Sequence, residues 1–312
     1  MISIALASYN GSKFIREQLD SILAQTYQDF EVVICDDCST DNTWQILGDY
    51  ASTDNRIKIF ENECNLGFKK NFEKAISLCS GEYIALSDQD DIWTKNHLEV
   101  LLTNLGDKSI AGGNAILVDA EGNSIGKKLN EVDDFTFFQE DKFIYRIIFT
   151  SDPIQGGSMI MPKKFIKKCL PIPEKVKYHD AWFAACACFE NGISYTFDVI
   201  NNYRQHGNNI TFSAHNKQQQ GLIKRIYSNY KKIKKGVDTD RFIYVESIKE
   251  KYGLVNKDFV FIYNIFEKLK GKKILSLSDI KQLWKNYYFI KSKKTHKGFL
   301  KFIIALHFRR SN

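Results

Sequence analysis

The sequence predicts an α/β fold, a mostly parallel sheet with helices on both faces, followed by an α-helical C-terminal region. Short apolar runs alternate with segments of helical spacing over residues 1–120, and acidic residues directly follow two of those runs. The last third of the chain combines helical spacing with many lysines and few glycines. Because parallel strands need crossover helices, this order predicts an α/β domain over residues 1–215 and a basic helical region over 216–312.

The individual elements follow from the apolar periodicity. Short apolar runs bounded by turn residues predict strands at 2–7, 30–35, 57–60, 83–86 and 110–118. Apolar residues at helical spacing predict helices at 15–23, 44–51 and 68–79. The order of these elements is the order of a parallel sheet, whereas residues 110–200 are otherwise less regular.

Length and composition indicate a globular protein with ordinary hydrophobic content. The 312 residues are enough to bury a full core, and 44% of them are hydrophobic. The first residues have no basic leader, and no apolar run reaches the length of a membrane span. The seven cysteines are scattered and odd in number, which indicates reduced thiols in a cytoplasmic protein.

The net charge of +7 conceals a strong asymmetry along the chain. Residues 1–216 carry a balance of −10, whereas residues 217–312, with 24 Lys and Arg against 7 Asp and Glu, carry +17. Such segregation predicts that the last third meets an anionic surface, either membrane lipid or nucleic acid. The apolar stretch at 299–308 favours shallow insertion into a membrane interface. The alternative is a packed helical domain with a solvated lysine face.

The most informative segment is the acidic run from Ser87 to Asp91, which follows the strand expected at 83–86. Three carboxylates in four positions repel one another, so a cation or cationic partner is expected beside them. The C-terminal end of a strand is where α/β sheets bind ligands, and hard oxygen ligands suit Mg²⁺ or Mn²⁺. The alternative is a solvated acidic turn that caps the next helix.

A second acidic run, from Asp36 to Asp41, follows the strand expected at 30–35. Carboxylates in this place can accept hydrogen bonds from a nucleobase N–H or from ribose hydroxyl groups. Ser39 or Asp41 can at the same time cap the next helix. Cys35 and Cys38 have CxxC spacing, but no second pair is present, which disfavours a zinc or redox site.

Four motifs taken in order carry a family resemblance. They are Ser8-Tyr9-Asn10-Gly11, the run Asp36-Asp37-x-Ser39-x-Asp41-x-Thr43, Asn65-x-Gly67 and Asp88-Gln89-Asp90-Asp91. Together they resemble family 2 glycosyltransferases with the GT-A fold, a Rossmann-like domain that binds nucleotide-diphospho-sugars. The wording Ser-Asp-Gln-Asp-Asp-Ile-Trp at 87–93 is similar to the rhamnosyltransferase-like branch. The resemblance covers about residues 1–210.

The resemblance implies roles for the residues of the N-terminal half. The residues implied at the base and ribose are Ala7, Tyr9 and Asp37, and those implied near the nucleotide or diphosphate are Asn65, Gly67 and Lys70. Asp88 and Asp90 are implied as the metal-binding pair, with Asp90 as the direct ligand, and Asp91 as a residue that orients the donor sugar or the metal shell. The register of the three acids stays open at this point.

The resemblance also implies a second half of the site. Asp180, in the run from Tyr178 to Trp182, matches the acid that acts as catalytic base, because a carboxylate can accept the proton of an acceptor hydroxyl. The alternative is that Asp180 only caps the helix that carries Trp182. Arg204 is expected to neutralise phosphate and His206 to bind metal or diphosphate. Gly157, in the tight stretch 155–158, completes the expected site.

The resemblance therefore implies a metal-dependent inverting glycosyltransferase that uses Mn²⁺ or Mg²⁺. Its donor is expected to be dTDP-rhamnose or a UDP-hexose, and its acceptor a lipid-linked glycan at the inner face of the cell membrane. A non-catalytic protein that binds sugar nucleotides is the first alternative. A nucleic-acid-binding protein is the second, and the lack of an aromatic RNA platform disfavours it. The oligomeric state stays open.

Overall fold

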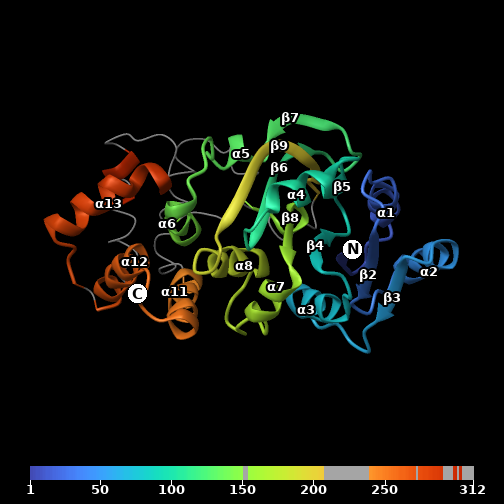
Figure 1. Cartoon of the computed structure of the whole chain (residues 1–312), viewed down its shortest axis with the longest axis horizontal. Helices are drawn as coiled ribbons and strands as arrows, with labels where there is room; N and C mark the ends of the chain where they lie inside the picture. The colour runs from blue at the N-terminus through green and yellow to red at the C-terminus, as the bar shows by residue number, and fades with distance from the viewer. Residues whose placement is uncertain (150–153, 207–238, 272, 291–297, 301, 304–312) are drawn as a thin grey trace. The chain divides into compact units, whose positions relative to one another are not determined.

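The computed structural model describes residues 1–149, 154–206, 239–271, 273–290, 298–300 and 302–303. The chain divides into two compact units (Figure 1), of which the first comprises residues 1–131 and 152–205. The second comprises residues 132–151 and 206–312. The domain boundary expected at 215 falls outside the described residues.

A mixed sheet forms the first unit, and the described residues contribute nine strands to it. The strands are β1 (Ile2–Ser8), β2 (Phe30–Asp36), β3 (Ile57–Glu61), β4 (Tyr83–Asp88), β5 (Ile92–Trp93), β6 (Ile110–Val118), β7 (Ser124–Lys128), β8 (Met159–Pro162) and β9 (Ile193–Arg204). Their spatial order is β3-β2-β1-β4-β8-β6-β9-β5, with β7 beside β6. The five expected strands are all present, and β1 to β4 run parallel as predicted.

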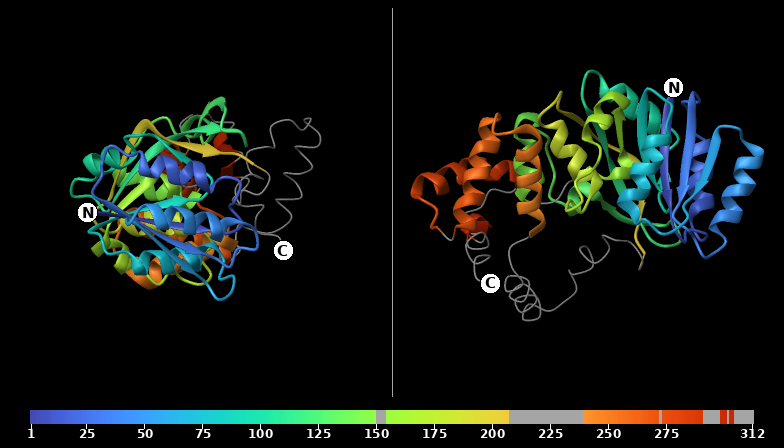
Figure 2. Two further views of the ribbon diagram at one scale, coloured as in Figure 1. Left: turned by 90° about the vertical axis from the view of Figure 1, so that its right-hand side faces the viewer. Right: turned by 90° about the horizontal axis from the view of Figure 1, so that it is seen from below.

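The helices of the first unit lie on both faces of the sheet (Figures 1 and 2). They are α1 (Ile15–Leu23), α2 (Thr43–Thr53), α3 (Phe68–Leu78), α4 (His97–Leu105), α5 (Leu129–Val132), α7 (Lys163–Cys169) and α8 (His179–Ala187). A short 3₁₀ turn, Gly156–Ser158, precedes β8. The helices expected at 15–23, 44–51 and 68–79 are confirmed as α1, α2 and α3.

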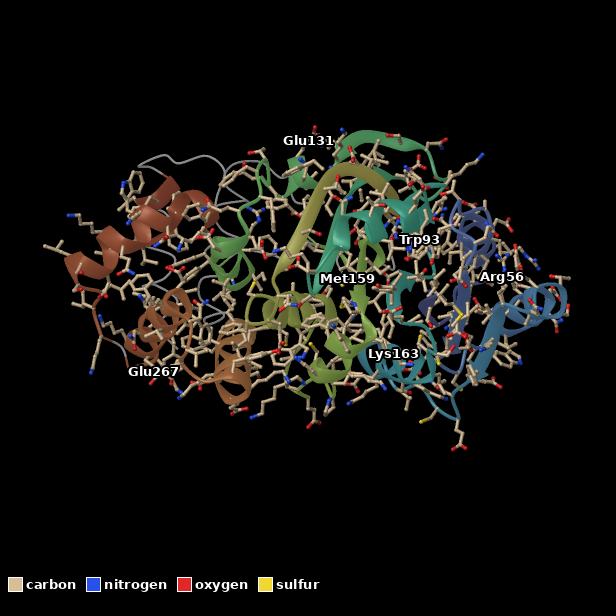
Figure 3. The ribbon with its side chains drawn as sticks, viewed as in Figure 1. Arg56, Trp93, Glu131, Met159, Lys163 and Glu267 are labelled. Atoms are coloured by element: carbon tan, nitrogen blue, oxygen red, sulfur yellow. The ribbon has the colours of Figure 1, made fainter. Side chains whose placement is uncertain are left out.

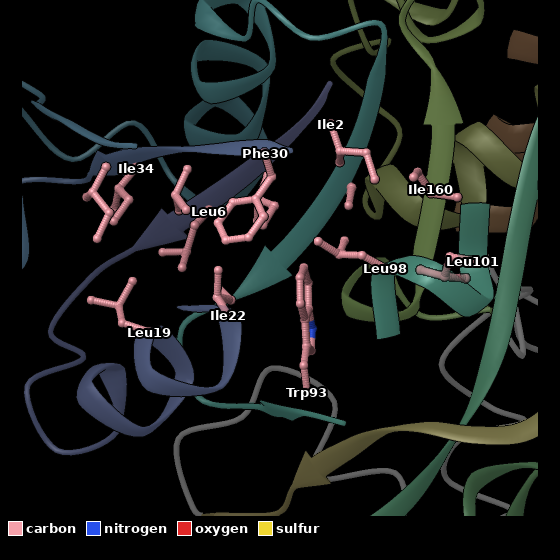
Figure 4. Close-up of a cluster of buried hydrophobic side chains, with 14 of the residues drawn as sticks. Ile2, Leu6, Leu19, Ile22, Phe30, Ile34, Trp93, Leu98, Leu101 and Ile160 are labelled. Carbon is pink, nitrogen blue, oxygen red and sulfur yellow. The ribbon is translucent and has the colours of Figure 1, made fainter. Parts of the chain in front are cut away.

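The core of the first unit lies between α1 and the parallel strands (Figure 4). Leu19 and Ile22 of α1 stand against Leu6 of β1 and Ile34 of β2, and all four side chains are fully buried. Full burial of each such side chain stabilises the fold by about 1.5–3 kcal/mol. The packing of α1 against the sheet therefore fixes the strands that carry the expected site residues.

Lys163, Lys58 and Glu31 connect parts of this unit that are distant in sequence. Lys163, the first residue of α7, donates to the carbonyl oxygen of Cys79 at 2.7 Å, which joins α7 to the end of α3 (Figure 3). Glu31 of β2 is buried and accepts hydrogen bonds from Ser3 Oγ at 2.6 Å, from Lys58 Nζ at 2.7 Å and from the N–H and hydroxyl of Ser80. All seven cysteines are free.

The second unit is helical, with one central helix. Its elements are η1 (Glu140–Lys142), α6 (Phe143–Phe149), α11 (Thr239–Tyr252), α12 (Lys257–Lys270) and α13 (Leu277–Ile290). Every residue of α6 is buried, and α11, α12 and α13 all contact it. Because α6 is buried on all sides, Arg146 included, other helices must cover it, and residues 132–151 belong to the same unit as the C-terminal helices. The sequence did not reveal this, since α6 lies far from them along the chain.

The structure corrects part of the membrane prediction for 299–308. Phe299 is buried, with its ring 4.8 Å from that of Trp284 and 5.2 Å from that of Tyr287. Phe302 lies against Phe149 at 5.6 Å between ring centroids. Phe299 is therefore not an exposed anchor, whereas Phe302 is half-buried and Leu300 between them is 59% exposed. None of the described helices is both long enough and apolar enough to span a bilayer.

Replacement of Glu31 by Gln should lower the free energy of unfolding by about 2 kcal/mol, because a buried carboxylate loses charge-assisted hydrogen bonds. Burial alone would raise the pKa of Glu31, but hydrogen bonds from Lys58, Ser3 and Ser80 lower it from 4.5 to about 2. The stabilisation is therefore complete above pH 4.5 and is lost as the pH falls towards 2. Urea unfolding from pH 7 to pH 2 measures this difference.

The matched control for this prediction is Asp49→Asn, which breaks an exposed ion pair with Arg16. It should change the free energy of unfolding by less than about 1 kcal/mol. A Glu31→Gln protein that equals the wild type at pH 7, or a difference that grows as the solution becomes more acidic, contradicts the role given to Glu31.

Candidate active site

The C-terminal ends of β1, β2 and β4 meet at one edge of the sheet. Ser8 pairs with Asp36 across β1 and β2, and Ala7 pairs with Asp88 across β1 and β4. Parallel pairing in register therefore brings together the segments that the sequence singles out at 7–9, 36–37 and 88–91. This is the edge where open α/β sheets bind their ligands.

Asp36 and Asp37 are buried and bind groups of the chain itself. Asp36 accepts from the hydroxyl group of Ser8 at 2.7 Å and from the N–H of Ser39 at 2.9 Å. Asp37 accepts from the N–H groups of Leu66 and Gly67, both at 2.8 Å, and from Asn62 Nδ2 at 2.7 Å. These bonds fix the loop before α3 beside the strand edge.

The neighbouring residues of the expected nucleotide pocket lie on this loop and on α3. Gly67 has a positive φ of 81°, and its N–H also donates to Asn65 Oδ1 at 3.0 Å. Lys70 is exposed and pairs with Glu73 of the same helix. Asp41 accepts from the N–H of Thr43 at 2.9 Å, although Asn42, not Ser39 or Asp41, is the N-cap residue of α2.

Gln89 joins the exit of β1 to the acidic run, a contact that sequence reasoning missed. Its side-chain amide accepts from the N–H of Tyr9 and donates to the carbonyl oxygen of Tyr9, both at 2.9 Å. The amide lies over Gly11, where a Cβ atom would come within 2.1 Å of Gln89 Oε1. Tyr9 remains 46% exposed at this edge of the sheet.

The acidic run forms a cluster with strongly perturbed carboxyl groups. Burial raises the pKa of Asp88 to about 7, and the charges of Asp90 and Asp180 add to the shift. Burial raises the pKa of Asp91 well above its ordinary value, and the charges of Asp90 and Asp88 add to this shift. Asp91 nevertheless accepts from Asn201 Nδ2 at 2.7 Å and from the N–H of Arg204 at 3.3 Å. The hydrogen bonds to Asp91 thus offset only part of the repulsion between the carboxylates of the cluster.

Glycines 156 and 157 provide the space for these carboxylates to approach one another. A Cβ atom on Gly157 would lie 2.8 Å from Asp91 Oδ2 and 3.6 Å from Asp88 Oδ2. A Cβ atom on Gly156 would lie 3.1 Å from His179 Nε2 and 4.0 Å from the Cβ atom of Asp180. The turn therefore stands between the acidic cluster and the start of α8, and larger residues would force them apart.

The donor set of the cluster fits part of the shell of a divalent cation. Among the residues that the structure describes, no three His, Cys, Asp or Glu side chains could hold a metal ion on their own. The Asp88 carboxylate accepts no hydrogen bond from any described residue, and Asp90 supplies a second carboxylate two positions further on. Mg²⁺ and Mn²⁺ are commonly bound by one or two carboxylates together with substrate phosphates and water.

Arg204 has a different role from the one that the sequence predicts. Its buried guanidinium donates to the carbonyl oxygens of Asp90 at 2.9 Å and Ala120 at 2.8 Å, and it pairs with Glu17. The guanidinium also lies 4.9 Å from the ring centroid of Phe14. Because protein groups already use its donors, Arg204 supports the backbone of the acidic cluster, and the expected contact with phosphate is corrected accordingly.

Asp180 lies in the first turn of α8, and its charge contributes to the raised pKa of Asp88. It is half-buried and accepts one hydrogen bond from described residues, from the N–H of Ala181 at 2.8 Å. Tyr178, not Asp180, is the N-cap residue of this helix. Asp180 is thus not the N-cap residue, although it accepts from an N–H group of the first turn, and its role as catalytic base stays a prediction.

The residues on either side of Asp180 are part of the core. The His179 ring is buried 4.3 Å from the ring of Phe72, and neither ring nitrogen has a partner among the described residues. Trp182 is buried and donates to the carbonyl oxygen of Cys169 at 2.9 Å, which anchors α8. His206 is the last residue before the segment 207–238, and its role as a ligand stays a prediction.

The loop held by Asp37 and the acidic cluster lie at the C-terminal edge of the parallel strands, and Asp180 adds a carboxylate whose charge acts on the cluster. The profile of Glycosyl transferase family 2 matches residues 3–170. The chain therefore belongs to glycosyl transferase family 2, as its motifs predict.

Two relatives illustrate the range of similarity. An uncharacterized glycosyltransferase of Haemophilus influenzae is 30% identical over 237 residues, which are 72% of each chain. The UDP-Glc:alpha-D-GlcNAc-diphosphoundecaprenol beta-1,3-glucosyltransferase WfgD of Escherichia coli is 38% identical over 104 residues. That match covers 33% of this chain and 40% of WfgD.

Two solved structures share the fold and confirm that it is GT-A-like. Staphylococcus aureus TarS 1–349 in complex with UDP-GlcNAc is 20% identical, with a TM-score of 0.60 over 99% of this chain and 88% of the other. The mannosyltransferase PcManGT of Pyrobaculum calidifontis, in complex with GDP-Man and Mn²⁺, is 17% identical, with a TM-score of 0.51 over 98% and 85%. At these identities the likeness concerns the fold alone.

Proposed function

We propose that the protein is an inverting glycosyltransferase that moves a sugar from a nucleoside diphosphate to a hydroxyl group of a lipid-linked glycan. The observation that carries this proposal is that the turn 156–157 lies between Asp180 and the acidic cluster: a Cβ atom on Gly156 would lie 4.0 Å from the Cβ atom of Asp180, and one on Gly157 would lie 3.6 Å from Asp88 Oδ2. At one sheet edge, the carboxylate of Asp180 can accept the proton of the attacking hydroxyl group, and the acidic cluster can bind the departing diphosphate through a cation. A non-catalytic sugar-nucleotide-binding protein would not need Asp180 there.

On the donor side, the exposed Tyr9 ring is the surface for the nucleobase, and the loop held by Asp37 lines the ribose and diphosphate. Asp90 and Asp88 would hold Mn²⁺ or Mg²⁺ through their carboxylates. Asp91 orients the donor sugar. When bound, the cation offsets the charge that develops on the departing diphosphate. We propose dTDP-rhamnose or a UDP-hexose as donor, the latter because WfgD uses UDP-Glc.

On the acceptor side, Asp180 accepts the proton of the attacking hydroxyl group. The oxygen then attacks the anomeric carbon from the side opposite the diphosphate, so one displacement inverts the configuration there. A carboxylate within reach of that proton lowers the barrier by general base catalysis. A lipid-linked acceptor in surface polysaccharide synthesis is consistent with the name of WfgD, whose acceptor is diphosphoundecaprenol-linked.

Nucleotide binding should depend on a divalent cation. The carboxylates at 88–91 already repel one another, and a diphosphate without a cation adds to that repulsion. UDP should therefore bind at least about tenfold more weakly in chelator than in Mn²⁺, and Asp90→Ala should remove most of this difference. Calorimetric titration measures it, after a thermal-shift panel of UDP, dTDP and GDP selects the nucleotide. Equal affinity with and without Mn²⁺ contradicts the metal assignment.

Asp180→Asn should keep nucleotide affinity and lose sugar transfer by about 10²–10⁴-fold, because the amide is nearly isosteric but accepts no proton. The readout is release of nucleoside diphosphate from the selected sugar nucleotide, in the presence of polyprenyl-diphosphate-linked GlcNAc. Glu190→Gln, which removes the half-buried partner of the exposed Lys168, is the matched control and should keep full activity. Survival of transfer in Asp180→Asn rules out this base.

We also propose that the basic C-terminal region binds an anionic membrane at the inner face of the cell membrane. The lysines at 291–297 lie outside the described residues, so the support comes from the turn between α12 and α13. Ile274 and Leu277 there are 80% and 86% exposed. Leu277 shares one face of α13 with the exposed Lys281 and Lys285. Exposed apolar side chains beside lysines suit binding to an anionic lipid interface.

The start of α13, where Leu277 lies, is held by reciprocal hydrogen bonds between Ser276 and Asp279. Asp279 accepts from the N–H and hydroxyl groups of Ser276, both at 2.7 Å, and the N–H of Asp279 donates back to the Ser276 hydroxyl at 3.2 Å. Lys268 adds an ion pair to Asp279 at 2.7 Å. Such a reciprocal cap lowers the entropy cost of presenting Leu277 to a surface.

Joint replacement of Ile274 and Leu277 by Ser should weaken binding to phosphatidylglycerol vesicles by about tenfold, because shallow apolar insertion is lost. Vesicle co-sedimentation at low and high salt measures it, and salt should weaken binding by the wild type. The control replaces Leu254 and Val255, exposed at the opposite end of α12, and should stay within about twofold. Stronger binding to a random oligonucleotide than to vesicles supports the nucleic-acid alternative.

A further inference from the structure

The segment between α7 and α8 leads directly to Asp180 and has no regular secondary structure of its own over residues 170–178. One turn within it is closed by the N–H of Val176, which donates to the carbonyl oxygen of Pro173 at 2.9 Å. An irregular segment of this length does not by itself fix the place of the helix that follows it. Its position must come from contacts with other elements.

A single lysine of α3 binds three carbonyl oxygens of this segment. Lys69 Nζ lies 2.6 Å from the carbonyl oxygen of Glu174, 2.9 Å from that of Val176 and 3.3 Å from that of Pro173. An ammonium group has three N–H donors and no acceptor, so three carbonyl oxygens match it completely. Charge-assisted hydrogen bonds of this kind are stronger than neutral ones.

The contacts continue along the same side of α3. Glu73 Oε1 accepts from the N–H of Ile172 at 2.5 Å, one turn after Lys69. The rings of Phe68 and Phe72 pack beside Tyr178 and His179, with centroids 6.5 Å and 4.3 Å apart. The side of α3 thus holds the segment from Ile172 to the residue before Asp180.

The other contacts of α3 reach the expected nucleotide pocket. Gly67, which starts the helix, donates to Asp37, and Asn71 Nδ2 donates to the carbonyl oxygen of Cys35 at 2.7 Å. Lys163 ties the far end of the helix at Cys79. One rigid helix therefore contacts both the strand edge for the donor and the segment that carries Asp180.

We propose that Lys69 is a positioning residue that fixes Asp180 relative to the acidic cluster through the carbonyl oxygens of residues 173–176. The proposal rests on the function proposed above, because that function gives Asp180 the role of base. Lys69 contacts no reacting atom in this scheme. Its loss should slow transfer while leaving donor affinity intact, since the loop held by Asp37 does not depend on the ammonium group.

The first test measures the position of the segment without using activity. Hydrogen–deuterium exchange on the full chain is compared for the wild type, Lys69→Met and the control Lys168→Met, whose ammonium pairs with Glu190. Amides of residues 172–183 should exchange about tenfold faster in Lys69→Met and at the wild-type rate in Lys168→Met. Amides of β1 and β4 report whether the fold itself is intact. Wild-type exchange over 172–183 in Lys69→Met overturns the proposal.

The second test separates positioning from donor binding. With the sugar nucleotide selected by thermal shift, Lys69→Met should lower kcat about tenfold and leave KM within about twofold. Lys69→Arg, which keeps the charge and several donors, should recover most of the lost rate. An unchanged kcat in Lys69→Met overturns the positioning role, whatever its exchange shows.

The two tests also separate this proposal from the function on which it rests. Full turnover in Asp180→Asn refutes the proposed base, whereas wild-type exchange in Lys69→Met refutes the anchor. If the wild type turns over no sugar nucleotide, the proposed function fails and the exchange measurement alone decides whether Lys69 holds the segment.

Discussion

The crowding of carboxylates at the ends of parallel strands is the constraint on which the rest of the site depends. β1 and β4 pair in register, so the acidic run emerges beside the exit of β1, and the start of α8 adds Asp180. Burial and mutual repulsion raise the pKa of Asp88 to about 7. A cluster with this energy cost persists only where the surrounding structure holds it firmly and where a ligand benefits from it.

The surrounding structure holds the cluster mainly through its backbone. Arg204 binds the carbonyl oxygen of Asp90 and, through its own N–H, the carboxylate of Asp91, while its charge is offset by Glu17. Gln89, which lies within the acidic run, ties the run to β1 through the backbone N–H and carbonyl oxygen of Tyr9. The main-chain groups of Asp90 and Tyr9 take these bonds, so the supports do not occupy the Asp88 carboxylate. The arrangement satisfies the requirement that a binding group be fixed by neighbours that do not compete for the ligand.

The sequence predicts the fold well, and it predicts which acidic segments the sheet brings to one edge, because both depend on local patterns. The apolar runs give the strands β1 to β4, and acids at strand ends must gather at one edge once those strands are parallel. The role of Arg204 was not predictable, since its partner Glu17 is almost the whole domain away along the chain. The same holds for α6, whose burial depends on helices that follow it by about ninety residues or more. Long-range contacts leave no periodicity in the sequence.

Helix α3 shows why a further class of contacts is invisible in a sequence. Phe68, Phe72 and Ala75 mark its apolar face, and Lys69 and Glu73, four positions apart, have the spacing of a solvated ion pair. In the structure Lys69 binds carbonyl oxygens instead, and Glu73 accepts from a backbone N–H. Backbone groups are present at every residue, so no residue type identifies the segment that such a lysine will hold. Charged residues beside the apolar face of a helix are therefore candidates for anchoring irregular segments, and only the fold shows which of them do so.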